Sequence, residues 1–409
     1  MSNLLDSIYY NVGNFIYLGV QWLISIVLVR MGGFEDAGYF SLAMTYGNIF
    51  CMLANYGLRS FQVSDIKNEF KDSTYIISRV LTIAISAILC LGFTSLFMGY
   101  SLNLNLLILC YIFYKLSESY ADVITGIWQK AGNMLFIGIS YTLKGISSLC
   151  SFLVAYHFTK NLLLSTFLMA VTHFVVLTAF DFSVTKKYTN HFKSYHCFDK
   201  NELTGLLKLG FMTMSFNVFT ALFNSIPRLV VEKRLSAEML GIFSSLYNPT
   251  VIISTFAVGV LLPFAPKMAM YYQQGNKKPL AKMLFLCNGI IALMGIFGAG
   301  STYLIGKPVF SLVYGKEILE YLNLFYILIA ASVLLGMSYS YSYLLIAIRK
   351  FKPLLLFSAL SCISVLGLSL YLIPEQNISG GAYASLGAIA LQFITETIYI
   401  CKLVNKLNN

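Results

Sequence analysis

The 409-residue chain is too apolar to be a soluble globular protein. Hydrophobic residues make up 58% of it and charged residues 11%, with a mean hydropathy of +0.74, whereas charged residues are about a quarter of a typical soluble domain. This composition excludes a soluble enzyme and indicates a chain that folds in lipid. In a membrane protein, a net charge of +11 is interpreted from the side of the membrane on which Lys and Arg lie. We therefore expect no nucleic acid partner.

The eight cysteines of the chain form neither a disulfide framework nor a metal-ligand pattern. None has Cys-x-x-Cys spacing, and seven lie within or at the ends of apolar stretches, where cysteine behaves as a small hydrophobic residue. The segment 188–199 contains His191, His196 and Cys197, but their spacing does not match a zinc site. We therefore expect no bound metal.

Apolar stretches of about twenty residues recur along the chain, which is the length that a helix needs to cross a bilayer. The N-terminus lacks the basic segment and cleavage site of a signal peptide, so the first stretch is expected to remain as an anchor. We expect an all-α polytopic membrane protein with twelve transmembrane helices. Their expected ranges are 11–29, 37–58, 75–98, 102–125, 135–158, 161–185, 204–226, 237–265, 283–305, 321–347, 354–373 and 380–402.

The positions of Lys and Arg indicate the orientation of the chain in the membrane. If both termini are cytoplasmic, the inner segments hold seventeen of these residues and the outer segments hold seven. Because positive residues concentrate on the cytoplasmic side, we expect both termini inside. Arg30, which follows the first span on the expected outer side, is an exception to this asymmetry.

The two halves of the chain resemble each other. VLVRMGGFEDAGYFSL at 27–42 aligns without a gap on VVEKRLSAEMLGIFSS at 230–245, an offset of 203 residues. Each half holds six expected spans, so the copies have the same orientation and are related by a pseudo-twofold axis along the membrane normal. We expect an N-terminal six-helix lobe at 1–185, a cytoplasmic linker at 186–203 and a C-terminal six-helix lobe at 204–409.

Three charged residues fall inside the span at 102–125. Ions facing lipid would cost about 2.5–3.5 kcal/mol each, so they are expected to face protein or water. A simple ion pair between Lys115 and Glu118, three residues apart, is the alternative to a direct functional role. At about 100° per residue the charges share one helix face with other polar side chains. The members of this stripe are Tyr111, Lys115, Glu118, Asp122 and Gln129.

Lys144, in the span at 135–158, lies at the same expected depth as Lys115. At about 1.5 Å per residue, both are roughly 15 Å from the inner loop that joins their spans. Two ammonium groups at one depth favour binding of an anion. Two further polar stripes either line the same cavity or bond between helices. They contain Ser41, Thr45, Asn48, Asn55 and Arg59 in one span and Thr213, Asn217, Thr220, Asn224 and Arg228 in another.

The acidic residues inside the spans are candidates for coupling transport to an ion. A desolvated carboxylate is suited to exchanging a proton or a cation, and Glu118, Asp122 and Asp181 are the candidates. Three other charged residues are expected at the inner interface, where long side chains extend toward water. They are Arg79, Lys208 and Glu396.

The first 130 residues carry an ordered series of motifs that is typical of a known family. RMGGFEDAGYFSLA at 30–43 is followed by ANYGLRSFQVSD at 54–65, by YIISR at 75–79 and then by the series Glu118, Asp122 and Gln129. In this order they resemble the Wzx-type flippases of O-antigen and capsule oligosaccharides. These proteins form the polysaccharide transporter branch of the multidrug/oligosaccharidyl-lipid/polysaccharide exporter superfamily. The length, the number of spans and the internal repeat agree with the same family over the whole chain.

This resemblance implies a function in surface polysaccharide synthesis. Two six-helix lobes would surround a cationic cavity that opens to each side of the bacterial cytoplasmic membrane in turn. The substrate would be a lipid-linked oligosaccharide on undecaprenyl diphosphate, moved from the inner to the outer leaflet in antiport with H⁺ or Na⁺, without an enzymatic step. Partners would include a polysaccharide polymerase and other assembly proteins. Arg30, Arg59 and Arg79 match basic positions of the family, and Glu118 and Asp122 match acidic ones.

Together these arguments give a set of candidate site residues. A lipid diphosphate carries about two negative charges, which fixed cations stabilise in place of water, while amides and hydroxyls suit sugars. The candidates for substrate binding are Arg30, Asn48, Arg59, Lys115, Lys144, Asn217 and Arg228, and those for ion coupling are Glu118, Asp122 and Asp181.

Three other classes of membrane protein are alternatives. A polysaccharide polymerase or ligase typically needs a large outer loop, and all the expected outer loops are short. A major-facilitator carrier shares the two-lobe organisation, but its basic Gly/Asp signature is absent from RSFQVSDIKNEFKDST at 59–74. A cation-coupled multidrug exporter of the same superfamily is the main alternative.

Overall fold

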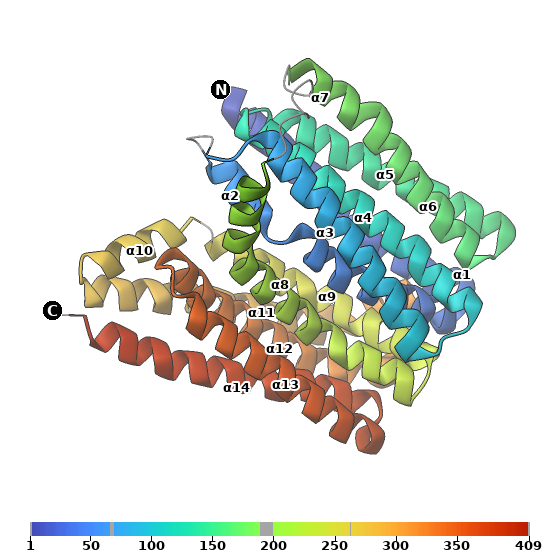
Figure 1. Ribbon diagram of the computed structural model, residues 1–409. Coiled ribbons are helices and arrows are strands. Elements are labelled where there is room, and N and C mark those ends of the chain that lie inside the picture. The colour runs from blue at the N-terminus through green and yellow to red at the C-terminus, as the bar shows by residue number, and fades with distance from the viewer. Residues whose placement is uncertain (1, 66–68, 189–198, 262, 408–409) are drawn as a thin grey trace. The chain divides into compact units, whose positions relative to one another are not determined.

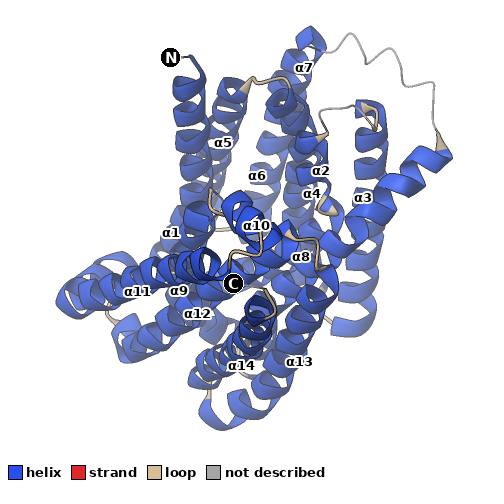
Figure 2. Ribbon diagram, turned by 90° about the vertical axis from the view of Figure 1, so that its left-hand side faces the viewer, coloured by secondary structure: helices blue, strands red, loops and turns tan. Residues whose placement is uncertain are grey.

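The computed structural model describes residues 2–65, 69–188, 199–261 and 263–407, and within these ranges all regular structure is helical (Figures 1 and 2). The first helices are α1 (Ser2–Asn55), α2 (Leu58–Ser64), α3 (Asp72–Gly92) with the π-helical η1 (Phe93–Met98), α4 (Leu102–Lys130), α5 (Met134–Thr159), α6 (Leu162–Val176) with the π-helical η2 (Leu177–Asp181), and α7 (Phe182–Tyr188). They are followed by α8 (Lys200–Arg234), α9 (Ala237–Leu261), α10 (Ala265–Gln273), α11 (Lys277–Tyr314), the 3₁₀-helical η4 (Glu317–Tyr321), α12 (Leu322–Ala347), α13 (Phe351–Gln376) and α14 (Ile378–Asn405).

Ten helical segments in the described residues are long and apolar enough to cross a membrane. One of them, α1, contains two spans, because Gly33 interrupts it with φ 78° and ψ −177°, a conformation that glycine adopts without steric strain. The 29-residue α4 is also long enough to span, although it carries four charged residues between Lys115 and Lys130. The predicted all-α polytopic fold with twelve spans is therefore confirmed.

The first of two compact units comprises Met1–Ala221. In it α5 packs along both α1 and α6, and α4 packs against α1 and α6. The α1–α5 contact is unusually close, since a Cβ atom added to Gly138 would lie 2.3 Å from the carbonyl oxygen of Tyr9. Small residues commonly allow such close approach of helices in membranes. A second packing centre surrounds Trp128, whose Nε1 donates to Thr185 Oγ1 at 3.1 Å.

The second unit comprises Leu222–Asn409. Helices α13 and α14 lie side by side (Figure 1), and α12 packs against α9, α11 and α14. Tyr341 of α12 stacks on Phe393 of α14, with ring centroids 5.6 Å apart. These contacts form the apolar interior into which the polar residues of α12 and α14 project.

The boundary between the two compact units lies within α8, between Ala221 and Leu222. Most of the predicted linker at 186–203 lies outside the described residues. The first half of α8 belongs to the first unit, because a Cβ atom at Gly210 would lie 2.8 Å from Leu58, and Leu206 is fully buried in the cluster around Trp128.

The internal repeat has a counterpart in the local structure of each unit. The offset of 203 residues aligns Gly33 with Ser236. Gly33 interrupts α1, and Ser236 lies in the break between α8 and α9. The aligned aromatic residues Phe40 and Phe243 are both buried. The two halves thus bend the chain, and bury an aromatic side chain after the bend, at corresponding positions.

Candidate functional site

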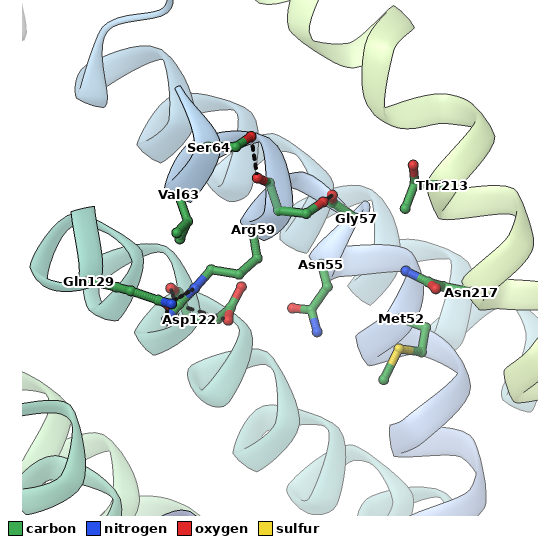
Figure 3. Close-up of a pocket in the computed structure, with 11 residues that line it drawn as sticks. Met52, Asn55, Gly57, Arg59, Val63, Ser64, Asp122, Gln129, Thr213 and Asn217 are labelled. Atoms are coloured by element: carbon green, nitrogen blue, oxygen red, sulfur yellow. Dashed lines mark hydrogen bonds and ion pairs between the residues drawn. The ribbon is translucent and has the colours of Figure 1, made fainter. Parts of the chain in front are cut away.

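A pocket of about 460 Å³ lies in the first unit, bounded by the end of α1, by α2, α4 and the first half of α8 (Figure 3). Eight of its eleven lining residues have polar side chains, and these include one basic and one acidic residue. The lining residues are Met52, Asn55, Gly57, Arg59, Ser60, Val63, Ser64, Asp122, Gln129, Thr213 and Asn217.

A tight turn between α1 and α2 positions Arg59. Tyr56 and Gly57 have φ values of 51° and 64°, so both are in the left-handed region, where glycine is favoured. Gly57 is also required by space, since a Cβ atom there would lie 2.7 Å from the Thr213 side chain of α8. The turn ends α1 and starts α2 in a new direction, which brings Arg59 against α4.

The guanidinium of Arg59 is held by three residues of α4. Its Nη1 lies 3.2 Å from Asp122 Oδ1 and donates to Thr125 Oγ1 at 2.7 Å. Its Nη2 donates to Gln129 Oε1 at 2.9 Å. The three partners are spaced three and four residues apart, so they lie on one face of α4. Figure 3 shows Arg59 reaching from α2 to Asp122 and Gln129.

Asp122 is shared between two arginines. Arg79 of α3 lies on its other side, with Nη2 2.8 Å from Asp122 Oδ2 and Nη1 donating to Asn55 Oδ1 at 2.9 Å. The Arg79 side chain is only 1% exposed, whereas those of Arg59 and Asp122 are 23% and 25% exposed. The prediction that Arg79 extends to the inner interface is therefore wrong: an ion pair and an amide hold its guanidinium inside the protein.

Lys115 and Glu118 form the ion pair that their spacing on α4 allows. Lys115 Nζ lies 2.7 Å from Glu118 Oε2, and the hydroxyl of Tyr17 donates to the same oxygen at 2.9 Å. Tyr17 is also bonded to Tyr114 at 2.8 Å. The pair is partly open to solvent on the acidic side, because the side chain of Glu118 is 31% exposed.

Lys144 and Asp181 form a second ion pair, which is fully buried. The ammonium of Lys144 on α5 contacts Asp181 Oδ2 at the end of η2, and Ser140 Oγ donates to Asp181 Oδ1 at 2.8 Å. Neither Lys115 nor Lys144 lines the pocket. In the described residues neither lysine is an unpaired cation, so an anion would have to displace a carboxylate to reach either one.

The remaining sequence candidates are distributed over both units. Asn217 lines the pocket with Arg59 and Asp122. Arg30 is exposed on α1 before the kink, and Asn48 is half-buried on the same helix. In the second unit, Arg228 Nη2 donates to Asn248 Oδ1 at 2.9 Å, and its guanidinium lies 4.3 Å from the centroid of the Tyr247 ring.

Sequence reasoning missed two features of the buried polar residues. Tyr17 is one tyrosine among 28, so its contact with Glu118 had no signal in the sequence. Glu396 was expected at the interface, but it is fully buried in α14 and bonded to Ser338 and Gln392. Glu396 lies well inside a long apolar stretch, and this position could have predicted that its side chain is buried.

The fold and the buried ion pairs define a polytopic helical membrane protein, in which ionisable residues inside spans commonly mark a transport pathway. Residues 4–270 match the family model described as polysaccharide biosynthesis protein, and the chain belongs to this family. It is also 27% identical over 388 residues to the capsular polysaccharide biosynthesis protein CapF of Staphylococcus aureus, covering 91% of this chain and 93% of CapF. These findings confirm the resemblance to polysaccharide transporters that the motifs indicated.

Solved structures with the same fold include transporters of lipids and drugs. The lipid II flippase MurJ, in an inward closed conformation, superposes with a TM-score of 0.77 at 15% identity, covering 98% of this chain and 90% of MurJ. An inward-facing multidrug resistance transporter of the MATE family, part of the MOP superfamily, gives a TM-score of 0.69 at 13% identity, with coverage of 98% and 96%. At these identities the likeness concerns the fold.

Proposed function

We propose that this protein is a flippase for lipid-linked oligosaccharides. It moves oligosaccharide units on undecaprenyl diphosphate from the inner to the outer leaflet of the bacterial cytoplasmic membrane, with both termini cytoplasmic, for synthesis of capsule or O-antigen. The membership in the polysaccharide biosynthesis family supports this proposal. The observation that carries it is the partly exposed Arg59 in a polar pocket.

The arrangement of the two arginines suits reversible binding of a diphosphate. Guanidinium groups bind phosphate oxygens through paired hydrogen bonds. When Arg59 turns toward a phosphate, Asp122 keeps its ion pair with Arg79 and is not left as an unpaired charge. The exchange therefore avoids most of the free energy that breaking a buried pair would require. Arg59 is the exposed partner and Arg79 the fixed one.

The uncharged side chains of the pocket are suited to the sugars. Asn55, Ser60, Ser64, Thr213 and Asn217 supply amides and hydroxyls, which donate and accept hydrogen bonds as sugar hydroxyls do. We assign the other candidates, which are Arg30, Asn48, Lys115, Lys144 and Arg228, to further contacts with the anionic substrate along its path. The two lysines take this role only after release from Glu118 and Asp181.

Coupling to H⁺ or Na⁺ follows from the same ion pairs. A proton or cation that neutralises Glu118, Asp122 or Asp181 releases the basic partner for the diphosphate. Substrate and coupling ion then occupy the protein alternately, as antiport by alternating access requires. Interaction with a polysaccharide polymerase or another assembly protein would deliver the product to the next step.

A cation-coupled multidrug exporter of the same superfamily is the second candidate function. The MATE family transporter, which shares the fold, is the observation in its favour. Drugs of this kind are mostly apolar or cationic and suit hydrophobic or acidic pockets. The pocket around Arg59 pairs its one acid, Asp122, with two arginines, which favours an anionic, hydroxyl-rich substrate over a cationic one.

Transport by purified protein in proteoliposomes tests the proposal. We expect flipping of a lipid-linked oligosaccharide by the wild type and a loss of about 10- to 100-fold in Arg59→Gln, since a charged hydrogen bond contributes about 1.5–3 kcal/mol. Lys307→Ala, which removes an exposed lysine, is the matched control and should transport normally. Export of a cationic dye without any flipping would favour the drug exporter and refute the proposal.

A further inference from the structure

The second unit contains a buried acid with an unusual environment. Glu396 on α14 is fully buried. Its Oε2 contacts the hydroxyl of Ser338 on α12, and its Oε1 accepts from Gln392 Nε2 at 2.9 Å. The same Gln392 nitrogen lies 3.0 Å from Ser338 Oγ. The three side chains thus form a closed polar cluster between two packed helices.

Glu396 differs from the three coupling candidates of the first unit in having no cationic partner. Asp122, Glu118 and Asp181 are each in an ion pair with an arginine or lysine. In the described part of the chain, no lysine, arginine or histidine nitrogen lies within 4.0 Å of the Glu396 carboxylate. The lysines of the packed helices α11, α13 and α14 are exposed or half-exposed: Lys277, Lys278, Lys282, Lys307, Lys352 and Lys402.

The other charged and titratable groups of the packed helices also provide no positive charge. Helix α12 carries no charged residue, and the acidic Glu238 of α9 and Glu375 of α13 lie near the ends of their helices. The titratable side chains inside these helices are tyrosines and cysteines, which are neutral in their ordinary form. They include Tyr341 on α12, Cys287 on α11, Cys362 on α13, Tyr247 on α9 and Cys401 on α14.

We propose that Glu396, Ser338 and Gln392 form a proton-binding site in the second unit, and that the proton is bound at neutral pH in the described state. An isolated carboxylate is strongly disfavoured inside a protein, whereas the neutral acid is tolerated when it is hydrogen-bonded. A protonated Glu396 donates its proton to Ser338 Oγ, so the observed contact is retained. The amide nitrogen of Gln392 at Oε1 is a donor, whereas a metal cation would require oxygen ligands there.

Infrared difference spectroscopy of the purified protein, wild type minus Glu396→Gln, tests this site directly. We expect loss of one protonated-carboxyl C=O band at neutral pH, and above the midpoint of its titration the wild-type band should fall about tenfold per pH unit. Glu118→Gln, the matched control, should instead remove a carboxylate band. Loss of a carboxylate band in Glu396→Gln, or disappearance of the C=O band when Na⁺ replaces choline, would overturn the proposal.

Two further variants keep the test decisive if Glu396→Gln does not fold. Ser338→Ala retains the acid but removes its hydroxyl partner, so it should shift the frequency of the same C=O band. Glu396→Asp moves the carboxyl group and should replace the band by one at a new frequency. A spectrum that is unchanged in the carboxyl region of both variants would contradict a protonated Glu396.

A role for this proton in transport rests on the proposed function. Because Glu396 is buried, the proton exchanges only when a rearrangement of the second unit admits water. We expect Glu396→Gln, which mimics the protonated acid, to flip substrate in proteoliposomes without responding to an imposed pH gradient. A retained response would remove Glu396 from coupling. Absence of flipping in the wild type would instead count against the proposed function, while the infrared result would still hold.

Discussion

At the scale of single residues, the ion pairs show what sequence periodicity reveals and what it omits. The polar stripe on α4 was predicted from spacing alone, and Arg59 binds two of its members, Asp122 and Gln129. The pairing of Lys144 with Asp181 was not predicted, because the two residues are 37 positions apart and lie in two different expected spans. Only the packing of α5 on η2 brings them together.

The difference in burial between the two lysine pairs leads to a prediction about stability. In Asp181→Asn the ammonium of Lys144 remains buried without a counter-ion, so we expect a loss of about 3–5 kcal/mol. Glu118→Gln leaves Lys115 beside a side chain position that is 31% exposed and should cost less than Asp181→Asn, because water can reach the ammonium from that side. Thermal unfolding of both variants in the same detergent measures the difference.

The combined variant Lys144→Met with Asp181→Leu provides the control for this interpretation. Replacing both buried charges with apolar side chains removes the unpaired ammonium and should recover most of the lost stability. Equal melting temperatures for Asp181→Asn and Glu118→Gln would show that the Lys144 pair is not buried as described.

At the scale of helices, apolar length predicted the spans well and their interruptions poorly. All twelve expected spans correspond to helical segments. The short helices α2 and α10 were not predicted, since seven and nine residues are too few for a clear periodic signal. The sequence also did not predict that α1 continues through the first hairpin. The conformation of a single residue, Gly33, makes this bend a kink within one helix instead of a loop between two helices.

The contact between α1 and α5 gives a prediction at this scale. Gly138→Leu would force the two backbones apart, since even a Cβ atom at Gly138 overlaps the carbonyl of Tyr9. We expect a loss of more than about 3 kcal/mol, beyond the usual range for overpacking. Gly19→Ala on α1 is the matched control: no atom lies within 4 Å of its added Cβ, and alanine favours a helix by about 1 kcal/mol.

Size-exclusion profiles and melting temperatures of the two glycine variants measure this effect. Gly138→Leu should give less folded protein, and Gly19→Ala should match or exceed the wild type. A folded Gly138→Leu protein with wild-type stability would mean that α1 and α5 are not in backbone contact at this point.

At the scale of the whole molecule, the repeat is a feature of the sequence, whereas the division into compact units is a feature of tertiary contacts. The aligned segments at 27–42 and 230–245 were visible because they share spacing and residue types. The division within α8 was not visible, because it depends on which side chains Leu206, Gly210 and Thr213 contact. Tertiary contacts of this kind leave no periodic pattern along a uniformly apolar helix.

The number of spans determines on which sides of the membrane the two termini lie. With α4 as a span the count is even, and both termini are on one side, which the distribution of Lys and Arg indicates is the cytoplasm. If the charges of α4 kept it out of the membrane, the count would be odd and the termini would lie on opposite sides. The ion pairs of Asp122 and Glu118 within the first unit remove the main obstacle to its insertion.

Reporter fusions to each terminus test this prediction. We expect a fluorescent protein to be active at both ends and alkaline phosphatase to be inactive at both, since the phosphatase folds only outside the cytoplasm. A phosphatase inserted in the loop after Tyr314 should be active, because an odd number of spans precedes it when α4 crosses the membrane. An active phosphatase at one terminus only would show that α4 does not cross the membrane. The Arg59 pocket would then not be built on a membrane-crossing helix.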